Sequence, residues 1–550
     1  MPSIACNDLT FTWPDGTAVL DGLDLTIGPG RTGLVGVNGS GKSTLLELIA
    51  GRLRPTRGAV QVDGVLAYLP QHLPLRAARA VDDALGIAAP RAALRALERG
   101  AVTAGHLATI GDDWDIEERA RAALDRLGLR GVGLDRTVGS LSGGEAVALG
   151  LAAVFLRRPE VLLLDEPTNN LDLVRRQHLY EAVAAYPGVL VTVSHDRALL
   201  ERVDQVAELR DGAVRVYGGD LRAYEAAVAT EQEAAARRVR TAEADVRRQR
   251  RELIEARVKL DRRRRTGRKQ ASQQRFPKVV AQKRKRQAQV SAGKLRDLHA
   301  QRVAGAEAAL DAAQAGVHDD DEIRIDLPDT QVPSRKVVLR CEAVNVGTPG
   351  GAPLWRSAID LEVRGPQRVA LLGHNGTGKT TLLRMITGAL RPATGAVHLG
   401  VAGVGYLPQR LDLLDDDRTV LDNVARWAPD ATANELRAAL ARFRLRGDRV
   451  LLPAGVLSGG ERFRVQLAAL LSARPAPQLL LLDEPTNNLD LASARQLEQA
   501  LASYRGALLV ASHDLPFLRA LGVTRWLHLD RERGLARDRT EHGGTVAPTR

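Results

Sequence analysis

Cysteine is scarce in this chain of 550 residues, which contains only Cys6 and Cys341. Two distant cysteines are too few for a disulfide framework, and they indicate a reducing compartment. Neither belongs to a Cys-x-x-Cys motif or lies near clustered histidines in the sequence, which argues against a thiolate metal site. The sequence therefore predicts a cytoplasmic protein without structural disulfides.

Long apolar runs and a secretory leader are also lacking. The longest candidate run, Ala146–Leu156, has 11 residues and fits a buried helix, whereas a membrane-spanning helix needs about 20. The N-terminus reads Met-Pro-Ser-Ile-Ala-Cys and leads directly into a strand-like segment, without the basic and apolar regions of a signal peptide. We expect no membrane span.

Excess positive charge is confined to one middle segment. The net charge is +12, but residues 221–300 contain 24 Lys and Arg against 9 Asp and Glu, so the rest of the chain sums to about −3. Residues 257–286 contain 14 Lys and Arg and a single acid, Asp261. This concentration predicts contact with nucleic-acid phosphates. The alternative is a solvated coiled coil that acts as a spacer, but a spacer would mix both signs of charge.

The two halves of the chain repeat the same motifs in the same order. Gly36–Ser43 returns 337 residues later as Gly373–Thr380, and Leu141–Glu145 returns 316 residues later as Leu457–Glu461. Tyr68–Gln71 returns 338 residues later, and the drop from 338 to 316 means that the first half has about 22 extra residues, somewhere within 72–140. A period this long indicates duplicated domains. The other repeated pairs are Tyr68–Gln71 with Tyr406–Gln409, Leu164–Asp172 with Leu482–Asp490, and Ser194–Asp196 with Ser512–Asp514.

Each half alternates short apolar runs with helix-like stretches, a pattern typical of a parallel sheet flanked by helices. The predicted strands are Thr32–Val35, Val161–Leu164, Val189–Val193, Val369–Leu372, Leu479–Leu482 and Leu508–Ala511. Between the halves, the compositions of residues 221–265 and 281–314 predict two long helices, which we expect to form a hairpin with a basic tip near Gly267 and Pro277. The predicted fold class is α/β, with domains at 1–220 and 334–535, a helical hairpin linker at 221–333, and a disordered tail at 536–550.

The glycine-rich octet of each half has the sequence of a P-loop. Backbone amides of such a loop cradle phosphates, the lysine reaches the β- and γ-phosphates, and the next hydroxyl ligates Mg²⁺. A plain glycine-rich turn is the alternative, and the duplication disfavours it. The predicted nucleotide-binding residues of the loops are Gly36, Asn38, Gly39, Gly41, Lys42, Ser43, Thr44, Gly373, Asn375, Gly376, Gly378, Lys379, Thr380 and Thr381.

Two acids follow a buried apolar run in each half. The first acid should hold Mg²⁺, and the second is placed to orient and polarise the attacking water. Nearby Gln and His residues are candidates to complete the γ-phosphate shell, although each of them alone would be interpreted as an ordinary polar residue of a loop. The candidate metal ligands are Ser43, Gln71, Asp165, Thr380, Gln409 and Asp483. The candidate catalytic residues are Glu166, Glu484, His195, His513, Gln71 and Gln409.

Leu-Ser-Gly-Gly-Glu between a Gln loop and an Asp-Glu strand is the signature motif of ATP-binding-cassette (ABC) ATPases, which this chain resembles over about residues 3–535. Two cassettes, no transmembrane domain and a long charged linker resemble the ABC-F family. The resemblance implies a Mg²⁺-dependent ATPase that acts on the ribosome, as a translation factor or an antibiotic-resistance protein. A DNA-structure-binding ATPase and the ATPase subunit of a transporter stay open as alternatives.

The resemblance also implies that the two cassettes of one monomeric chain close head to tail over two ATP molecules. Site one would pair the first P-loop with the second signature motif, and site two the reverse. The signature residues are Ser142, Gly143, Gly144, Ser458, Gly459 and Gly460, with Asp172 and Asp490 at the interface. Trp13 can stack on adenine at site one, whereas the matching stretch Val344–Gly351 has no aromatic residue. Asn170 and Asn488 stand where the family commonly has His.

In ABC-F proteins the linker typically reaches into the ribosome near the peptidyl-tRNA. The resemblance thus agrees with the charge argument, and the expected partners of the linker are ribosomal RNA and tRNA phosphates. The predicted contact residues at the tip are Arg262, Arg263, Arg264, Arg265, Arg268, Lys269, Lys283, Arg284, Lys285 and Arg286.

Overall fold

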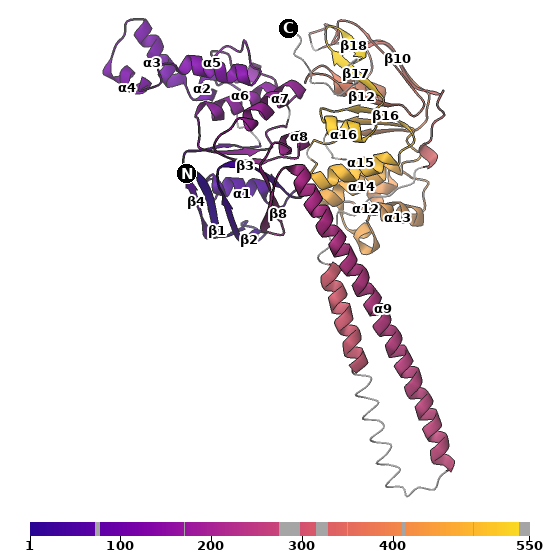
Figure 1. Cartoon of the computed structure of the whole chain (residues 1–550). Helices are drawn as coiled ribbons and strands as arrows, with labels where there is room; N and C mark the ends of the chain where they lie inside the picture. The colour runs from indigo at the N-terminus through magenta and orange to yellow at the C-terminus, as the bar shows by residue number, and fades with distance from the viewer. Residues whose placement is uncertain are drawn as a thin grey trace. The chain divides into compact units, whose positions relative to one another are not determined.

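The computed structural model describes residues 1–71, 77–169, 171–273, 298–314, 328–348, 350–409, 413–487 and 489–537. The chain divides into two units, of which one combines Met1–Arg222 with Glu322–Arg550 and the other is Ala223–Asp321. Figure 1 labels their helices and strands. The first unit holds both cassettes, and we refer to residues 1–222 as cassette one and to 328–537 as cassette two.

Cassette one is built on a six-stranded sheet beside a smaller one. Its elements are β1 Ser3–Thr12, β2 Ala18–Ile27, β3 Gly30–Val35, α1 Lys42–Ile49, β4 Arg57–Asp63, β5 Leu66–Leu69, α2 Val81–Leu85, α3 Ala88–Glu98, α4 Ala104–Ile110, α5 Ile116–Arg126, α6 Gly143–Leu156, β6 Val161–Asp165, α7 Leu173–Ala184, β7 Val189–Val193, α8 Arg197–Leu200, β8 Gln205–Arg210 and β9 Ala213–Gly218. The large sheet has the order β5-β6-β7-β3-β8-β9, parallel except for the β8–β9 pair. The small sheet, β2-β1-β4, is antiparallel.

Cassette two repeats this topology. Its elements are β10 Val337–Asn345, β11 Ile359–Arg364, β12 Arg368–Leu372, α11 Lys379–Ile386, β13 Thr394–Leu399, β14 Val404–Leu407, α12 Val420–Ala425, α13 Ala433–Arg442, α14 Gly459–Leu471, β15 Leu479–Asp483, α15 Leu491–Ala502, β16 Ala507–Ala511, α16 Leu515–Ala520, β17 Arg525–Asp530 and β18 Gly534–Arg537. The sheets are β14-β15-β16-β12-β17-β18 and the antiparallel β11-β10-β13. The predicted α/β class, strands and buried helix are confirmed, whereas the antiparallel sheets were not predicted.

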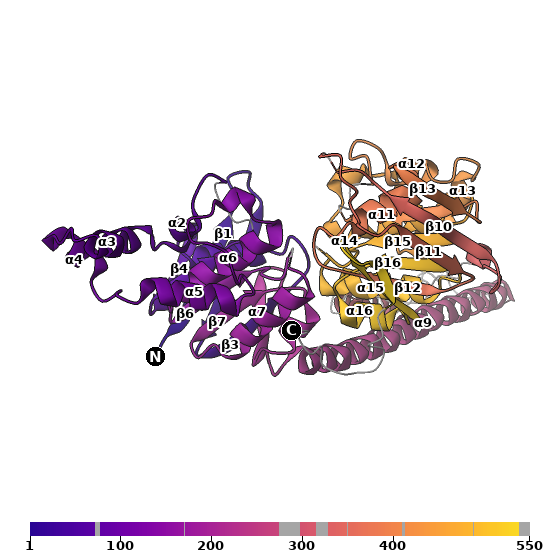
Figure 2. The ribbon, with the colours of Figure 1, turned by 90° about the horizontal axis from the view of Figure 1, so that it is seen from above.

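The central strands are apolar on both faces because each face packs against a different layer. In β15, Leu480 and Leu482 join the core formed with α12–α16, whereas Leu479 and Leu481 join the core formed with α11 and the small sheet. This division follows from the alternation of side chains along a strand. Figure 2 shows cassette two from above, with β10, β11 and β13 grouped near α11. The motif-bearing loops leave the carboxyl ends of strands β12 and β15 in this buried sheet.

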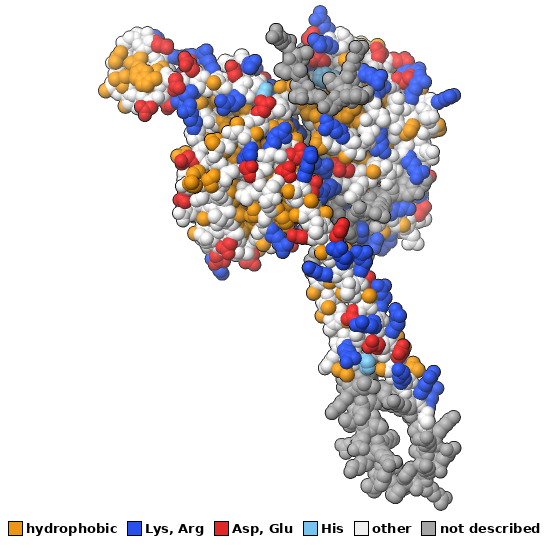
Figure 3. Space-filling model, viewed as in Figure 1, with side chains coloured by type: hydrophobic (Ala, Val, Ile, Leu, Met, Phe, Trp, Pro, Cys, Tyr) orange, Lys and Arg blue, Asp and Glu red, His pale blue; other side chains and the backbone are white. Residues whose placement is uncertain are grey.

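The extra residues of cassette one form a pair of helices, α3 and α4. Four helices, α2 to α5, precede the signature motif in cassette one, whereas the described part of cassette two has α12 and α13 there. Figure 3 shows apolar side chains gathered over the end of this insertion. Val102, Leu107 and Trp114, between α3 and α5, are exposed apolar residues. The 22-residue difference in motif spacing therefore corresponds to a local helical insertion.

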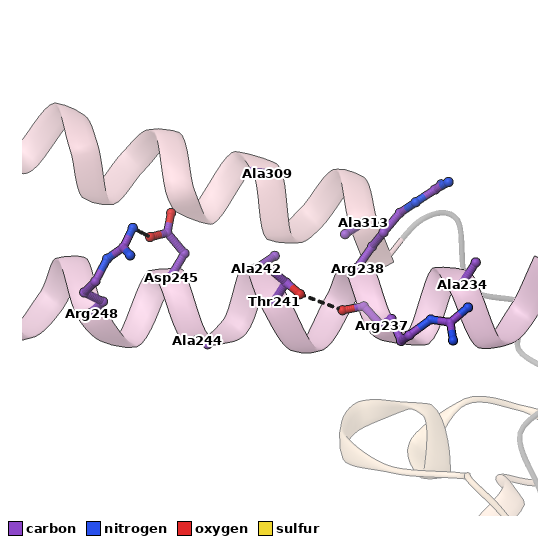
Figure 4. Close-up of a pocket in the computed structure, with 10 residues that line it drawn as sticks. All are labelled: Ala234, Arg237, Arg238, Thr241, Ala242, Ala244, Asp245, Arg248, Ala309 and Ala313. Atoms are coloured by element: carbon purple, nitrogen blue, oxygen red, sulfur yellow. Dashed lines mark hydrogen bonds and ion pairs between the residues drawn. The ribbon is translucent and has the colours of Figure 1, made fainter.

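The second unit contains α9, Leu221–Gln273, and a helical stretch at residues 298–314. Arg250 on α9 lies 2.6 Å from Glu307 in an ion pair. Figure 4 shows an open groove of about 870 Å³ between these helices, lined by small side chains such as Ala242 and Ala309 and by arginines. The expectation that the first helix ends before Gly267 was wrong, because α9 continues through it to Gln273. A helical glycine costs about 1 kcal/mol relative to alanine, which a helix of 53 residues tolerates.

Two predicted boundaries differ from the observed elements. Residues 328–330 form a 3-10 turn whose Thr330 hydroxyl accepts a hydrogen bond from the Arg505 amide, at 3.3 Å. The Gln331 carbonyl accepts another from the Gln478 side chain, at 3.2 Å. The end of the predicted linker thus packs on cassette two. Strand β18 reaches Arg537 and enters the range predicted to be a disordered tail, and residues 538–550 lie outside the described residues.

Candidate functional site

Each P-loop connects a central strand to a helix, β3 to α1 and β12 to α11. A Cβ atom on Gly36 would lie 2.4 Å from the Leu209 carbonyl oxygen, and one on Gly373 would lie 2.4 Å from that of Leu529. Both glycines have φ near +150°, so no other residue fits there. The close approach fixes the path of the loop, whose amides then precede the helix N-terminus, a favourable place for phosphate.

The P-loop lysines are buried and folded over their own loops. Lys42 Nζ donates to the carbonyls of Gly36 at 2.8 Å and Val37 at 3.0 Å. Lys379 Nζ donates to Gly373 at 2.7 Å and lies 2.9 Å from His513 Nε2. Burial lowers the pKa of both lysines. The ammonium groups are held at the loops, where a phosphate would neutralise them.

The acidic pairs stand at the ends of β6 and β15. Burial raises the pKa of Asp165 and Asp483, and it raises the pKa of Glu166 to about 8 and that of Glu484 to about 7. Both glutamates have a left-handed backbone, with φ of 47° and 46°. This conformation costs a non-glycine residue on the order of 1–3 kcal/mol and is concentrated at functional sites.

The strained backbone of each glutamate is held by the neighbouring strand. The Glu166 amide donates to the Val193 carbonyl at 2.8 Å, and the Glu484 amide donates to the Ala511 carbonyl at 2.7 Å. These bonds join the end of β6 to β7, which leads to His195, and the end of β15 to β16, which leads to His513. The site thus presents a carboxyl in the same pose in both cassettes.

The histidines, named in the sequence analysis as candidates for the γ-phosphate shell, lie against the glutamates. His195 Nε2 is 3.0 Å from Glu166 Oε1, and His513 Nε2 is 3.4 Å from Glu484 Oε1. Burial lowers the pKa of His195 to about 3 and that of His513 to about 2. Both imidazoles are therefore neutral at physiological pH and can exchange hydrogen bonds without adding charge.

The donor set fits a hard cation such as Mg²⁺. Asp165 Oδ1 and Asp483 Oδ1 are buried oxygen atoms with no hydrogen-bond partner among the described residues. Hydrogen bonds connect Ser43 to Asp165 and Thr380 to Asp483, so each P-loop hydroxyl is next to its carboxylate. Oxygen ligands of this kind are those Mg²⁺ prefers, with substrate phosphates and water completing its octahedral shell.

A cavity of about 410 Å³ brings the cassette-one candidates together. Its lining residues are Trp13, Val19, Asn38, Gly39, Gly41, Lys42, Ser43, Thr44, Gln71, Glu166, Asn169, Val193 and His195. Trp13 packs edge-on against Phe11, with ring centroids 4.9 Å apart. P-loop, Gln loop, glutamate, histidine and a partly exposed tryptophan therefore share one cavity.

The two cassettes contact each other through these same motifs. Asp490 Oδ2 accepts a hydrogen bond from the Asn38 amide at 2.9 Å, and Asp172 Oδ2 lies 3.0 Å from His374 Nδ1. A Cβ on Gly459 would lie 3.7 Å from that of Asn38, so the second signature motif faces the first P-loop. Each P-loop is thus met by the aspartate that follows the acidic strand of the other cassette.

Each signature serine caps its helix. Ser142 and Glu145 form a capping box at the start of α6, and Ser458 and Glu461 form one at the start of α14. Both serines and the first glycine of each motif, Gly143 included, are exposed, and a Cβ on Gly143 would have nothing within 4 Å. The exposed amides at these helix N-termini suit an anion.

Other predicted residues are exposed, lie on α9 or fall outside the described residues. Gln409, like Gln71, is exposed. Arg262 and Arg265 are exposed on α9. Arg263, Arg264, Arg268 and Lys269 lie on α9 with side chains that are not described, and Lys283, Arg284, Lys285, Arg286, Asn170 and Asn488 lie outside the described residues.

The sequence prediction missed Trp355, His374, Arg175 and Arg176. Trp355 is fully buried and donates from Nε1 to the Thr377 carbonyl at 2.7 Å, so its indole ring supports the P-loop of cassette two. Arg176 is buried and bonds Asp196 at 3.2 Å. A position-by-position comparison of the two halves could have identified these residues, because the matching position in the other half holds a different residue type.

This geometry is that of two P-loop ATPase cassettes in one chain, and comparisons with known proteins agree. The family model described as ABC transporter matches residues 20–169 and 357–487. The chain is 34% identical over 537 residues to the tylosin resistance ATP-binding protein TlrC of Streptomyces fradiae. This match covers 91% of this chain and 92% of that protein. It is 30% identical over 536 residues to the energy-dependent translational throttle protein EttA of Mycobacterium tuberculosis, covering 91% and 87%.

Solved structures show the same fold. An RNase-L inhibitor structure superposes with a TM-score of 0.54 at 18% identity, covering 95% of this chain and 87% of that chain. The family model and the two relatives show that the chain belongs to the ABC superfamily and, within it, to the ABC-F family; it is an ATPase that binds and hydrolyses ATP. No helix in the described part of the chain combines the length and apolar content needed to cross a membrane.

Proposed function

We propose that this protein is a ribosome-acting ATPase that alters translation or protects the ribosome from an antibiotic. The observation that carries the proposal is a tandem-cassette chain whose excess positive charge lies in one segment, residues 221–300. Relatives that match over most of its length bear names tied to antibiotic resistance and to translation. Arg262 and Arg265 in this segment are exposed and available to phosphates.

The cassettes supply the energy-dependent step. Lys42 and Lys379 bind the β- and γ-phosphates, and Asp165 and Asp483 would hold Mg²⁺, which would supply positive charge to neutralise the developing charge on the phosphates. Glu166 and Glu484 then orient the attacking water, positioned by the left-handed turn that follows each acidic strand. Because burial raises the pKa of both glutamates, cations that approach the site must lower it again before the carboxyls can ionise and polarise water.

Closure of the two cassettes completes each site in this proposal. Site one takes Ser458, Gly459 and Gly460 from cassette two, and site two takes Ser142, Gly143 and Gly144 from cassette one. The contacts Asn38–Asp490 and His374–Asp172 support this head-to-tail arrangement. ATP holds the cassettes together because the helix N-termini of α6 and α14 can meet a γ-phosphate only across the interface, and hydrolysis releases them.

The linker makes the contact with the ribosome in this proposal. α9 extends for 53 residues, or about 80 Å at 1.5 Å per residue, which is longer than a small domain is wide. Its arginines bind rRNA and tRNA phosphates as exposed cations, with an affinity that falls steeply with salt because counterions are released.

Co-sedimentation tests the proposal. The Glu166→Gln/Glu484→Gln chain, incubated with ATP, should pellet with ribosomes, whereas the Lys42→Ala/Lys379→Ala chain should not. Retention of the chain by branched DNA but not by ribosomes would support a DNA-structure-binding ATPase instead. Recovery with membrane proteins and without ribosomes would support the transporter subunit.

A further inference from the structure

An asymmetric ionic contact joins the two cassettes at site two. His374 is the second residue of the cassette-two P-loop, and Asp172 is the N-cap residue of α7 in cassette one. The imidazole Nδ1 lies 3.0 Å from Asp172 Oδ2. The Asp172 side chain is only 3% exposed and that of His374 is 53% exposed, so one partner is fixed and the other faces solvent.

The contact continues into the signature motif of cassette one. The Arg175 guanidinium donates to the same Asp172 Oδ2 at 2.9 Å, and its other terminal nitrogen lies 3.8 Å from Glu145 Oε1. The Glu145 carboxylate in turn accepts the Ser142 amide at 2.8 Å. A chain of charges therefore leads from one P-loop to the signature segment of the other cassette.

Site one lacks this chain. The position of His374 is occupied there by Val37, and that of Arg175 by Ser493. Asp490, the counterpart of Asp172, accepts hydrogen bonds from the amides of Asn38 at 2.9 Å and Ser493 at 2.8 Å. The two sites thus share the aspartate but differ in the residues beside it, which are His374 and Arg175 at site two and Val37 and Ser493 at site one.

We propose that His374, Asp172 and Arg175 form a charged clasp that strengthens ATP binding at site two when His374 is protonated. The clasp holds the cassette-two P-loop against the signature segment of cassette one. It acts at the site that has no exposed aromatic residue comparable to Trp13. This inference rests on the composite ATP sites proposed above, and His374 acts in it as a positioning residue.

The charges around His374 support the direction of this effect. Asp172, through its hydrogen bond, raises the pKa of His374, while burial, Arg175 and Lys379 oppose the shift without cancelling it. His513 also faces this group, and the His528 ring lies 6.2 Å away. Closure therefore takes up a proton. The contribution of protonated His374 to ATP binding is fully present below the ordinary pKa of 6.5. It is lost as the pH rises through the raised pKa of His374.

The experiment measures ATP binding to a Lys42→Ala/Glu484→Gln chain, in which site one is disabled and bound ATP is not hydrolysed. The dissociation constant should increase as the pH is raised from 6 to 8. His374→Val should remove this dependence and weaken binding at pH 6 about three- to fivefold, the range for a half-exposed ion pair. His374→Gln keeps a hydrogen-bond donor without charge, so it should also lose the pH dependence.

Two control variants separate the clasp from a general loss of folding. His528→Phe removes a neighbouring imidazole and should keep the pH dependence. Arg175→Ser introduces the residue found at the matching position of site one. It should weaken ATP binding at every pH, while the pH dependence that comes from His374 and Asp172 persists. An unchanged pH dependence in both His374 variants overturns the clasp alone. A Lys42→Ala/Glu484→Gln chain that binds no ATP overturns the assignment of site two, and the clasp with it.

Discussion

Glu166 and His195 form a buried pair in which Oε1 lies 3.0 Å from Nε2. Burial favours the neutral form of each partner, so the pKa of the carboxyl is raised and that of the imidazole is lowered. Cassette two repeats the pair with Glu484 and His513. Catalytic power and conformational stability therefore make opposite demands on these glutamates, since only the ionised form can polarise water.

This pair predicts how the stability of the nucleotide-free protein depends on pH. The pKa of Glu166 is about 8 in the folded state against 4.5 ordinarily, so the folded state binds a proton that the unfolded state has lost. The free energy of unfolding should decrease as pH rises from about 6.5 to about 8, a window in which His195 no longer titrates. Glu166→Gln should reduce this decrease, as measured by thermal denaturation. Glu98→Gln, at an exposed position, should leave it unchanged.

Substitution of both glutamates should stop turnover without preventing ATP binding. Glu166→Gln with Glu484→Gln keeps the shape of each side chain but removes its ability to accept a proton, a loss of about 10² to 10⁴ in rate. Phosphate release measures the first effect and equilibrium binding of ATP the second. Turnover near that of the parent chain would show that other groups activate the water.

Trp13 should contribute to adenine binding at site one alone. Stacking of an aromatic ring contributes on the order of 1 kcal/mol, so Trp13→Ala should weaken ATP binding about fivefold in a Lys379→Ala chain. Trp355, which contacts the P-loop of cassette two, is buried and cannot offer a ring face to adenine. The control is Trp114→Ala, because Trp114 is exposed on the insertion, away from the P-loop in sequence. The same affinity in parent and Trp13→Ala chains would contradict stacking.

The tip arginines should determine the salt dependence of ribosome binding. Changing residues Arg262–Arg265 to Ala removes four positive charges, and each lost phosphate contact flattens the slope of log K against log salt by about 0.7–0.9. ATP binding should not change, because Arg262 lies about 60 Å along α9 from Leu221 at 1.5 Å per residue. Sedimentation with ribosomes across a salt series provides the measurement.

A control for the tip variant removes the same charge elsewhere. The exposed set Arg54, Arg437, Arg442 and Arg446, changed to Ala, should keep both affinity and slope. Equal losses in both variants would mean that net charge, and not the tip, governs binding. Normal binding by the tip variant at every salt concentration would identify the linker as a spacer.

Arg91 should be the residue that anchors the insertion of cassette one. It is 3% exposed and bonds Asp82 at 2.7 Å, Glu117 at 2.8 Å and Asp135 at 2.7 Å. Arg91→Met removes all three charge-assisted bonds at once and should lower the free energy of unfolding by about 2 kcal/mol. Arg95→Met, at an exposed position, should lower the free energy of unfolding by less than about 1 kcal/mol. Chemical denaturation would compare the two, and equal losses would contradict the anchoring role.

The sequence was sufficient for everything that depends on local pattern. The glycine octets, the acidic pairs and the apolar runs before them located both P-loops and the central strands, because strand alternation and phosphate-loop chemistry act over a few residues. The change in motif spacing also located the insertion, although not its two helices. The helix through Gly267 shows the limit of this reasoning, since a single unfavourable residue does not stop a long helix.

The tertiary structure decided what depends on approach between distant segments. Asp172 meets His374 across 202 positions and Asn38 meets Asp490 across 452, and no local pattern encodes which residues oppose each other once two duplicated domains come together. The burial of Trp355 and the left-handed backbone of Glu166 likewise depend on packing and on hydrogen bonds to a neighbouring strand. Sequence repetition made the two ATP sites look nearly alike, and their non-local contacts made them physically different.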